Sequence, residues 1–182
     1  MSHRIIFVGG VHGVGKSTLC RKICNEISVV HRSASDLISR ITKNKFPLNK
    51  CIEGLESNQD ILILAIDRYL DTEQYYLLDG HFCLLDRHGE VNDVAISTFI
   101  AMSPIAIVLL YDDPAKICAR IKNRDNEMCD VQFISKYQDR EIALAQKVAD
   151  ALKVPIIKAN PFLEKDTLCD MICRLTDKRS SG

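Results

Sequence analysis

The sequence has no excess of charge of either sign, no apolar run long enough to cross a membrane and no low-complexity segment. Its 182 residues carry 24 Lys and Arg against 24 Asp and Glu, so no overall field favours DNA, RNA or an anionic membrane surface. We therefore expect no nucleic-acid partner, no membrane contact and a cytoplasmic protein. No internal repeat is visible, which predicts one domain over residues 1–176 and a flexible tail at residues 177–182.

The eight cysteines include no C-x-x-C pair, the spacing that zinc ribbons and redox dithiols normally need. Two pairs stand four residues apart on predicted helices, where the members of each pair share one face: Cys20 with Cys24, and Cys169 with Cys173. We expect free thiols, mostly structural and buried. Cys51 and Cys129, in predicted loops, are the more exposed exceptions.

One motif stands near the start of the chain. Directly after the apolar run Ile5 to Val8, residues 10–17 fit the pattern G-x-x-x-x-G-K-[ST] at every required position. Glycines let the backbone curl so that its N–H groups face phosphate oxygens, and the following helix adds its positive end. The motif predicts a nucleotide-phosphate site made of Gly10, Gly13, Val14, Gly15, Lys16, Ser17 and Thr18. In this pattern Lys16 reaches the β- and γ-phosphates and the Ser17 hydroxyl binds Mg²⁺.

Apolar runs alternate with helical patterns along the rest of the chain. Strands are predicted at residues 4–8, 29–30, 75–78, 105–111 and 154–158, and a small hairpin at 81–91. Helices are predicted at 16–27, 58–70, 114–122, 131–152 and 163–175. A further helix is predicted to begin within Ser33–Asp36, and a loop or short helix is predicted at 42–57. The unbroken apolar run at 105–111 is typical of a central parallel strand. We therefore predict an α/β fold: a doubly wound, five-stranded parallel sheet with helices on both faces.

The residues after the third predicted strand narrow the chemistry. Asp79 is followed by Gly80 and His81, whereas motor-like and transport ATPases commonly have a water-activating glutamate after this aspartate. GTPases generally read guanine with N-K-x-D, and the candidate beginning at Asn49 carries Ile52 in place of the aspartate. These two absences disfavour both classes. Asp79 is predicted to contact Mg²⁺ through a water molecule.

Together these residues resemble the nucleoside monophosphate kinases, and among them the short archaeal-type adenylate kinases. The resemblance covers nearly the whole chain and depends on the loop at 10–17, Asp79-Gly80-His81, the turn at 112–114, and Arg120 with Arg124 before a long helix. It implies a P-loop kinase domain with a short lid, Mg-ATP as donor and a nucleoside monophosphate such as AMP as acceptor. Lys16, Asp79, Arg120 and Arg124 would be the catalytic residues, and Arg120 would also contact ATP.

The lid arginines also have a physical rationale. Phosphoryl transfer needs positioning and concentrated positive charge around the γ-phosphate, and two arginines four residues apart share one side of a helix end. A single guanidinium group can donate two parallel hydrogen bonds to a phosphate group. The alternative is a solvated helix end in which Arg120 and Arg124 pair with nearby carboxylates. Arg140 lies where the resemblance expects a further phosphate contact, with a surface role as its alternative.

The acceptor site is predicted from weaker signals. Asp36 and Arg40 resemble the segment that holds the monophosphate in adenylate kinases, although Arg40 lies one residue later than usual. The alternative makes Asp36 a helix-start residue and Arg40 a surface charge. His81 matches the histidine of the D-x-H strand end, while His12 has no expected role. Gln59 and Lys50 lie in a stretch that could line the pocket, without diagnostic spacing.

The main hypothesis is thus a phosphotransferase that uses ATP, Mg²⁺ and a small acceptor. One alternative is an ATP-binding regulatory switch that keeps the kinase fold and hydrolyses ATP slowly. Another is a kinase of a different small molecule, since that broader group shares the loop and the lid. The sequence identifies nucleotides as partners and indicates no particular protein partner.

Overall fold

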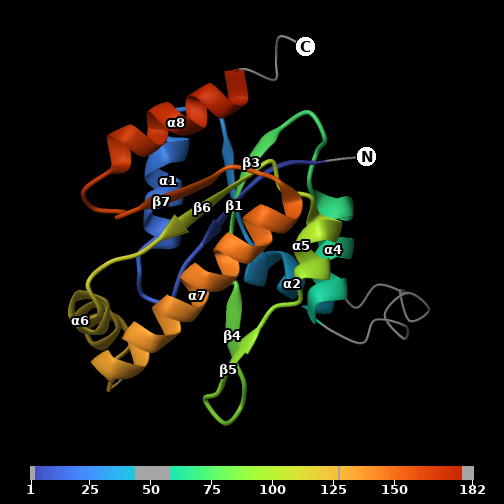
Figure 1. Cartoon of the computed structure of the whole chain (residues 1–182). Coiled ribbons are helices and arrows are strands. Elements are labelled where there is room, and N and C mark those ends of the chain that lie inside the picture. The colour runs from blue at the N-terminus through green and yellow to red at the C-terminus, as the bar shows by residue number, and fades with distance from the viewer. Residues whose placement is uncertain (1–2, 44–57, 127, 178–182) are drawn as a thin grey trace.

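The computed structural model describes residues 3–43, 58–126 and 128–177. Its main sheet contains five parallel strands in the order β2-β3-β1-β6-β7 (Figure 1). The strands are β1 (Arg4–Gly9), β2 (Val30–Ser33), β3 (Tyr75–Asp79), β6 (Ala106–Leu110) and β7 (Ile156–Ala159). The predicted five-stranded parallel sheet is confirmed.

Helices cover both faces of this sheet. They are α1 (Lys16–Cys24), α2 (Ala34–Lys43), α4 (Asn58–Tyr69), α5 (Ile96–Met102), α6 (Pro114–Asp125), α7 (Val131–Leu152) and α8 (Lys165–Asp177). Helices α1 and α8 pack together at the upper left in Figure 1, while α7 crosses the front of the sheet and contacts β6 and β7. Helix α5 bridges α7 and α4, and α2 packs against α4. The doubly wound prediction is therefore confirmed.

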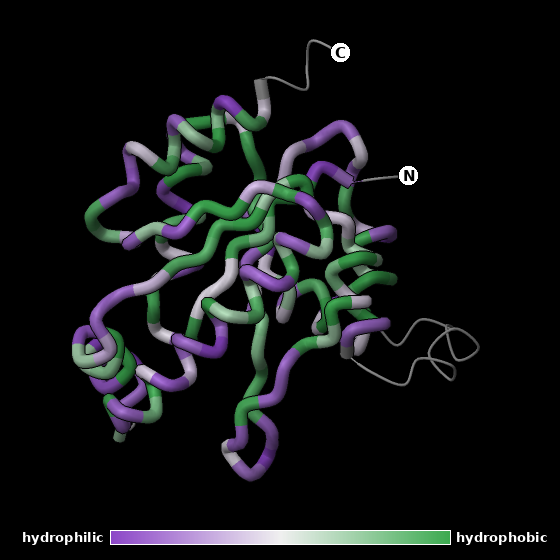
Figure 2. Tube along the Cα trace, in the orientation of Figure 1, coloured by the Kyte–Doolittle hydropathy of each residue, from purple (hydrophilic) through white to green (hydrophobic). Residues whose placement is uncertain are grey.

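The core lies between the sheet and these helices. Strands β3 and β6 are buried along their whole length, and the tube in Figure 2 is hydrophobic through the central strands. Three rings, Phe7, Phe82 and Phe99, pack with centroids 5.0–5.3 Å apart at distances where aromatic pairs attract. Parallel register sets Val8 of β1 beside Asp79 of β3. The carboxyl ends of the strands therefore meet at one edge of the sheet, where ligands bind in this architecture.

Several boundaries differ from the predicted ones. Strand β2 continues to Ser33, which pairs with Asp79, so α2 begins directly after the strand. Helix α6 runs past the predicted end to Asp125 and stops at Asn126, whose left-handed backbone (φ 56°) caps it. Helix α5 was not predicted, and β7 begins at Ile156. The predicted hairpin is present as β4 (Cys83–Leu85) and β5 (Val91–Asp93).

Some predictions fall outside the described residues. Of the loop or short helix expected at 42–57, only residues 42 and 43 are described, and they belong to α2. Lys50, Cys51 and the segment compared with N-K-x-D lie outside the described residues. So do residues 178–182 of the expected tail, whereas Asp177 is the last residue of α8.

The prediction that the cysteines are free is wrong for two of them. Cys118 of α6 and Cys129, just before α7, form a disulfide with their Cα atoms 5.3 Å apart. The turn at Asn126 reverses the chain and brings the two residues together, although no C-x-x-C spacing links them. The five other described cysteines are free thiols, three buried and two half-buried: Cys20, Cys83 and Cys169, then Cys24 and Cys173.

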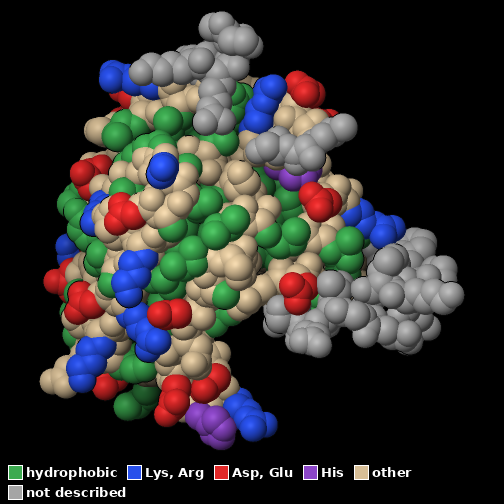
Figure 3. Space-filling view, turned by 45° about the vertical axis from the view of Figure 1, so that its right-hand side comes forward, with side chains coloured by type: hydrophobic (Ala, Val, Ile, Leu, Met, Phe, Trp, Pro, Cys, Tyr) green, Lys and Arg blue, Asp and Glu red, His purple; other side chains and the backbone are tan. Residues whose placement is uncertain are grey.

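The surface is mixed in charge. In the space-filling view, Lys and Arg side chains alternate with Asp and Glu over the face shown (Figure 3), in keeping with the balanced composition. None of the helices in the described part of the chain has both the length and the apolar character needed to cross a membrane.

Candidate active site

The loop between β1 and α1 has the geometry of a phosphate cradle. Gly10, Gly13 and Gly15 all have positive φ, at 142°, 80° and 111°, a region that side chains disfavour. Space is restricted as well, because a Cβ atom at Gly13 would come within 2.6 Å of Ile121 on α6. Gly15 is the N-cap of α1 and provides no side-chain cap. The first N–H groups of α1 are thus available to an anion.

Lys16 supplies a buried cation at this cradle. Its Nζ donates hydrogen bonds to the backbone oxygens of Gly10 (2.7 Å) and Val11 (3.1 Å). Burial lowers the pKa of Lys16 to about 8, against the opposing attraction of Glu141 and Asp79. The lysine is therefore held against the loop. The negative charge of a bound phosphate would stabilise its protonated form.

Asp79 is the last residue of β3, the strand that neighbours β1 in the sheet. Its Oδ2 is 2.6 Å from Nε2 of His31 on β2. Burial raises the pKa of Asp79, but hydrogen bonds from His31 and Ser17 outweigh it, so the pKa lies below its ordinary value. A carboxylate beside a serine hydroxyl offers the hard oxygen ligands that Mg²⁺ prefers. The pair Ser17 and Asp79 therefore fits the predicted metal.

The phosphate pocket around these groups has a volume of about 710 Å³. Its lining includes most of the predicted nucleotide-binding residues: Gly13, Gly15, Lys16, Ser17, Thr18, Asp79, Arg120 and Arg124. Gly10 and Val14 do not line it. Val14 is fully buried, and Gly10 packs against the end of β6, where a Cβ atom would meet the backbone oxygen of Leu110 at 2.6 Å. These two residues therefore belong to the loop but support its conformation from the core side.

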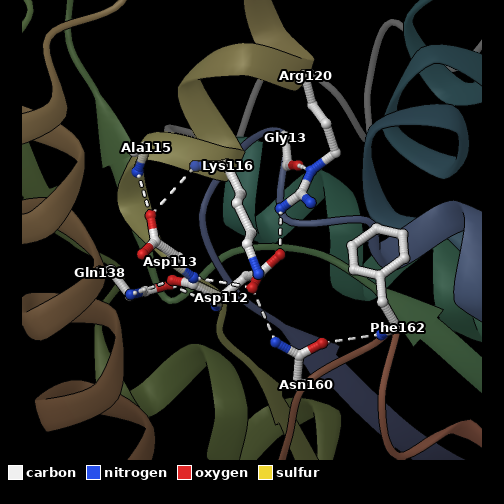
Figure 4. Close-up of polar contacts among 9 residues, drawn as sticks. All are labelled: Gly13, Asp112, Asp113, Ala115, Lys116, Arg120, Gln138, Asn160 and Phe162. Atoms are coloured by element: carbon white, nitrogen blue, oxygen red, sulfur yellow. Dashed lines mark hydrogen bonds and ion pairs between the residues drawn. The ribbon is translucent and has the colours of Figure 1, made fainter.

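Arg120 reaches from α6 to the wall of the phosphate pocket (Figure 4). Its Nε donates to the backbone oxygen of Gly13 at 3.0 Å, and its Nη2 donates to Oδ2 of Asp112 at 2.7 Å. The guanidinium also lies 4.5 Å from the ring centroid of Phe162, within cation–π range. Asn160 bonds the other oxygen of Asp112 at 2.8 Å. Sequence reasoning missed Phe162 and Asn160, because they belong to no motif.

Arg124 lies one turn further along α6 and is more exposed. It pairs with Asp125 at 2.6 Å and contacts His12 in the phosphate loop. His12, for which the sequence indicates no role, lies 3.4 Å from Asp125. Both predicted lid arginines therefore extend from α6 and contact the phosphate loop directly.

A second pocket, of about 400 Å³, adjoins the first. The two share His12, Ser33, Ser35, Asp79 and His81. The remaining walls of this second pocket are mainly apolar, so we call it the apolar pocket. They are formed by Phe7, Ile38, Leu62, Leu84, Val94, Phe99 and Met102. Gln59 also lines it and accepts a hydrogen bond from Thr98 at 3.2 Å. Of the predicted acceptor residues, Gln59 and His81 are brought together here.

The other three predicted acceptor residues line neither pocket. Asp36 is exposed in the first turn of α2. Arg40 is exposed with its guanidinium 5.9 Å from the Tyr69 ring. Arg140 pairs with Asp93 of the hairpin at 2.6 Å. In this structure the three occupy the surface positions described by their alternatives.

Glu141 is a site residue that the sequence analysis did not select. It is fully buried on α7, and its two oxygens accept from the backbone N–H groups of Phe82 and Cys83 at 3.1 Å. His81 Nδ1 lies 3.5 Å from one of these oxygens, and burial lowers the pKa of His81. The sequence contains a signal for this residue: Glu141 is a charged side chain that interrupts the apolar face of a long amphipathic helix.

A phosphate loop after the first strand of a 2-3-1-6-7 parallel sheet, with arginines reaching it from a later helix, defines a P-loop protein of the kinase fold. The family model described as an AAA domain, AAA_17, matches residues 9–137. The chain belongs to this family.

A curated relative extends the comparison. The chain is 30% identical over 161 residues to the "Probable UMP-CMP kinase 2" of Arabidopsis thaliana. The match covers 84% of this chain and 58% of the relative, so the chain spans little more than half of that protein's length.

Solved structures agree on the fold. A shikimate kinase from Acinetobacter baumannii, in complex with shikimate, has a TM-score of 0.58 at 18% identity, covering 97% of this chain and 94% of the other. A gluconokinase from Sinorhizobium meliloti 1021 has a TM-score of 0.50 at 13% identity, covering 93% and 95%. The broader expectation of a P-loop kinase-like family is supported. The narrower resemblance to archaeal-type adenylate kinases stays a prediction.

Proposed function

We propose that the protein transfers the γ-phosphoryl group of Mg-ATP to a small acceptor, a nucleoside monophosphate such as AMP. One observation carries the proposal. The phosphate pocket and the apolar pocket share Asp79 and His81, so that donor and acceptor would meet at the end of β3. A direct transfer requires such a junction, because the two reacting oxygens must line up through the phosphorus.

The donor half follows from the groups around the loop. The N–H groups of the loop and of the start of α1 would bind the β- and γ-phosphates, together with Lys16. Ser17 and Asp79 would hold Mg²⁺, which when bound offsets negative charge on the phosphate oxygens. Arg120 and Arg124 line the same pocket and would stabilise the charge that develops during transfer.

The acceptor half follows from the second pocket. Two aromatic rings, Phe7 and Phe99, line it beside the amide of Gln59. Such walls suit a flat base, and an amide can both donate to its edge and accept from it. The name of the Arabidopsis relative, a probable UMP-CMP kinase, supports a monophosphate acceptor. The preference for AMP depends on the resemblance to adenylate kinases.

A second candidate function has its own support. Among the described residues, no Lys or Arg lines the apolar pocket, although an acceptor phosphate is normally met by positive charge. This favours either an acceptor without a phosphate or a switch that hydrolyses ATP slowly and signals its nucleotide state.

The test is ADP formation from Mg-ATP with a panel of acceptors: AMP, CMP, UMP, GMP, shikimate and gluconate. We expect a monophosphate to raise the rate at least tenfold over ATP alone, and Lys16→Ala to abolish that gain. Gln59→Leu should raise KM for the acceptor by about tenfold or more, since it removes the polar contact. Gln132→Leu, at an exposed position of α7, is the matched control.

Equal rates with and without every monophosphate would overturn the proposal. In that case, stimulation by shikimate or gluconate would indicate another small-molecule kinase. Slow, acceptor-independent hydrolysis would favour the switch.

A further inference from the structure

Three potential metal ligands of different chemistry meet behind the phosphate pocket. The Sγ of Cys20, a ring nitrogen of His31 and a carboxylate oxygen of Asp79 all lie within 4.8 Å of one another. Cys20 and Asp79 are buried and His31 is half-buried. Within the described part of the chain, no second group of three His, Cys, Asp or Glu side chains comes this close.

The convergence follows from the fold. In β2, His31 precedes Ser33 by two residues, and Ser33 pairs with Asp79 of β3, so His31 and Ser33 share a face of the sheet. Helix α1 packs against both strands. Cys20 lies four residues after Lys16 on α1, and both are buried, so they share one face of the helix. Three separate elements thus position the group.

The donor set indicates which metal fits. Sulfur, imidazole nitrogen and carboxylate oxygen together suit Zn²⁺, whereas Mg²⁺ prefers oxygen alone. We propose that Cys20, His31 and Asp79 form a zinc-binding site, with a fourth position for water on the side of Asp79 that faces the phosphate pocket. Three protein ligands and a water are the pattern of zinc sites that keep an open position, whereas structural sites are closed by four protein ligands.

The distances require a small rearrangement. Tetrahedral zinc places its ligand atoms about 3.5 Å apart. The His31–Asp79 contact of 2.6 Å would therefore open by about an ångström as metal bonds replace the hydrogen bond. The thiol of Cys20 would give its proton to solvent when its sulfur binds, so one proton is released from this residue for each metal bound.

Zinc at this position has a consequence that rests on the proposed function. Zinc bound to Asp79 would neutralise the carboxylate charge that is proposed for the Mg²⁺ shell, and it would repel a second divalent cation placed beside it. Zinc should therefore inhibit phosphoryl transfer in competition with Mg²⁺. Cys20→Ser should weaken this inhibition at least tenfold without lowering the zinc-free rate, since Cys20 lines neither pocket.

The binding test does not depend on activity. Co²⁺, a spectroscopic substitute for Zn²⁺, is titrated into the metal-free full chain, and the thiolate-to-cobalt charge-transfer absorption in the near ultraviolet is recorded. We expect one equivalent to bind, with the band abolished by one equivalent of Zn²⁺. The band should disappear in Cys20→Ser, and the affinity should fall at least tenfold in His31→Asn.

Cys24→Ser is the matched control, since Cys24 is one turn further along α1 and outside the cluster. It should keep the band. Circular dichroism checks that each variant is folded, and His31→Asn serves if Cys20→Ser is not. The proposal is overturned if the wild-type chain gives no charge-transfer band, or if the band and its affinity survive loss of Cys20 or His31. Absence of phosphotransfer with an intact band would overturn only the proposed function.

Discussion

Arg120 donates a hydrogen bond from its Nε to the backbone oxygen of Gly13 across 3.0 Å, although 107 residues separate them in the chain. The same guanidinium is bonded to Asp112, two residues after the end of β6. One side chain therefore links α6 to the phosphate loop and to the carboxyl end of the sheet. The position of this arginine is set before any ligand arrives, and such preorganisation is what charge stabilisation requires.

Arg120→Ala should weaken ATP binding and lower phosphotransfer by about 10²-fold, because it removes a positioned donor from the pocket. Arg120→Lys should restore little, since an ammonium cannot bond Gly13 and Asp112 together as the planar guanidinium does. The measurements are ATP affinity by calorimetry and kcat/KM. Lys122→Ala, exposed on the same helix, should leave both values unchanged. Full activity in Arg120→Ala would contradict the assigned role.

Gly13→Ala should damage the loop more than its backbone angle alone explains. Gly13 and Gly89 have nearly equal φ values, 80° and 79°, but only Gly13 has a neighbour, Ile121, within reach of a new Cβ. Gly89→Ala should cost only the strain of a left-handed residue, about 1–2 kcal/mol. Gly13→Ala should cost more and also reduce ATP affinity. Urea unfolding and calorimetry measure the two effects, and equal stability losses would contradict the steric argument.

ATP affinity should fall as the pH rises above about 8. The pKa of Lys16 is about 8 in the free protein because burial disfavours its charge, and bound phosphates favour the charged form. This charge therefore contributes fully to ATP affinity below pH 8. The contribution is lost as the pH rises through 8, and the affinity then falls by up to tenfold per pH unit. Calorimetry at pH 7 to 9.5 in buffers of different ionisation enthalpy should show about one proton taken up near pH 9 and none in Lys16→Met. Constant affinity over this range would contradict the prediction.

Glu141→Gln should destabilise the fold by about 2 kcal/mol, since an amide NH₂ would face a backbone N–H group of Phe82 or Cys83 that now donates to the carboxylate. Asp139→Asn, exposed on the same helix, should change the free energy of unfolding by less than about 0.5 kcal/mol. Urea unfolding gives both values. Glu141 also raises the pKa of Lys16, so the pH dependence of ATP binding should shift downward in Glu141→Gln. Equal stability of the two variants would show that the buried carboxylate is not needed.

Much of the fold could be predicted because its signals are local. The run at 105–111 was apolar without alternation, which identified the buried strand β6. The predicted bounds of α7 agree with the structure because Asp130 caps its first turn and Lys153 ends it in a left-handed conformation. Helix α5 was missed, since its seven residues are too few for a clear periodicity.

The acceptor residues show the limit of motif reasoning. Asp36 and Arg40 were selected by their place after the second strand, but α2 begins one residue after Ser33 and directs both to the surface. Gln59 was selected on weaker grounds and lines the apolar pocket. A shift of one or two residues at the start of a helix changes which side chains face a pocket, because each residue turns the helix by about 100°.

Local sequence signals were enough to predict the phosphate loop, the order of strands and helices and the place of Asp79 at a strand end, because each depends on neighbours within a few residues. Four contacts could be found only from the packing of the folded chain: Arg120 with Gly13, His31 with Cys20 and Asp79, Cys118 with Cys129, and Glu141 with the start of the hairpin. These contacts depend on how separate elements pack, and local spacing does not encode the distance between them.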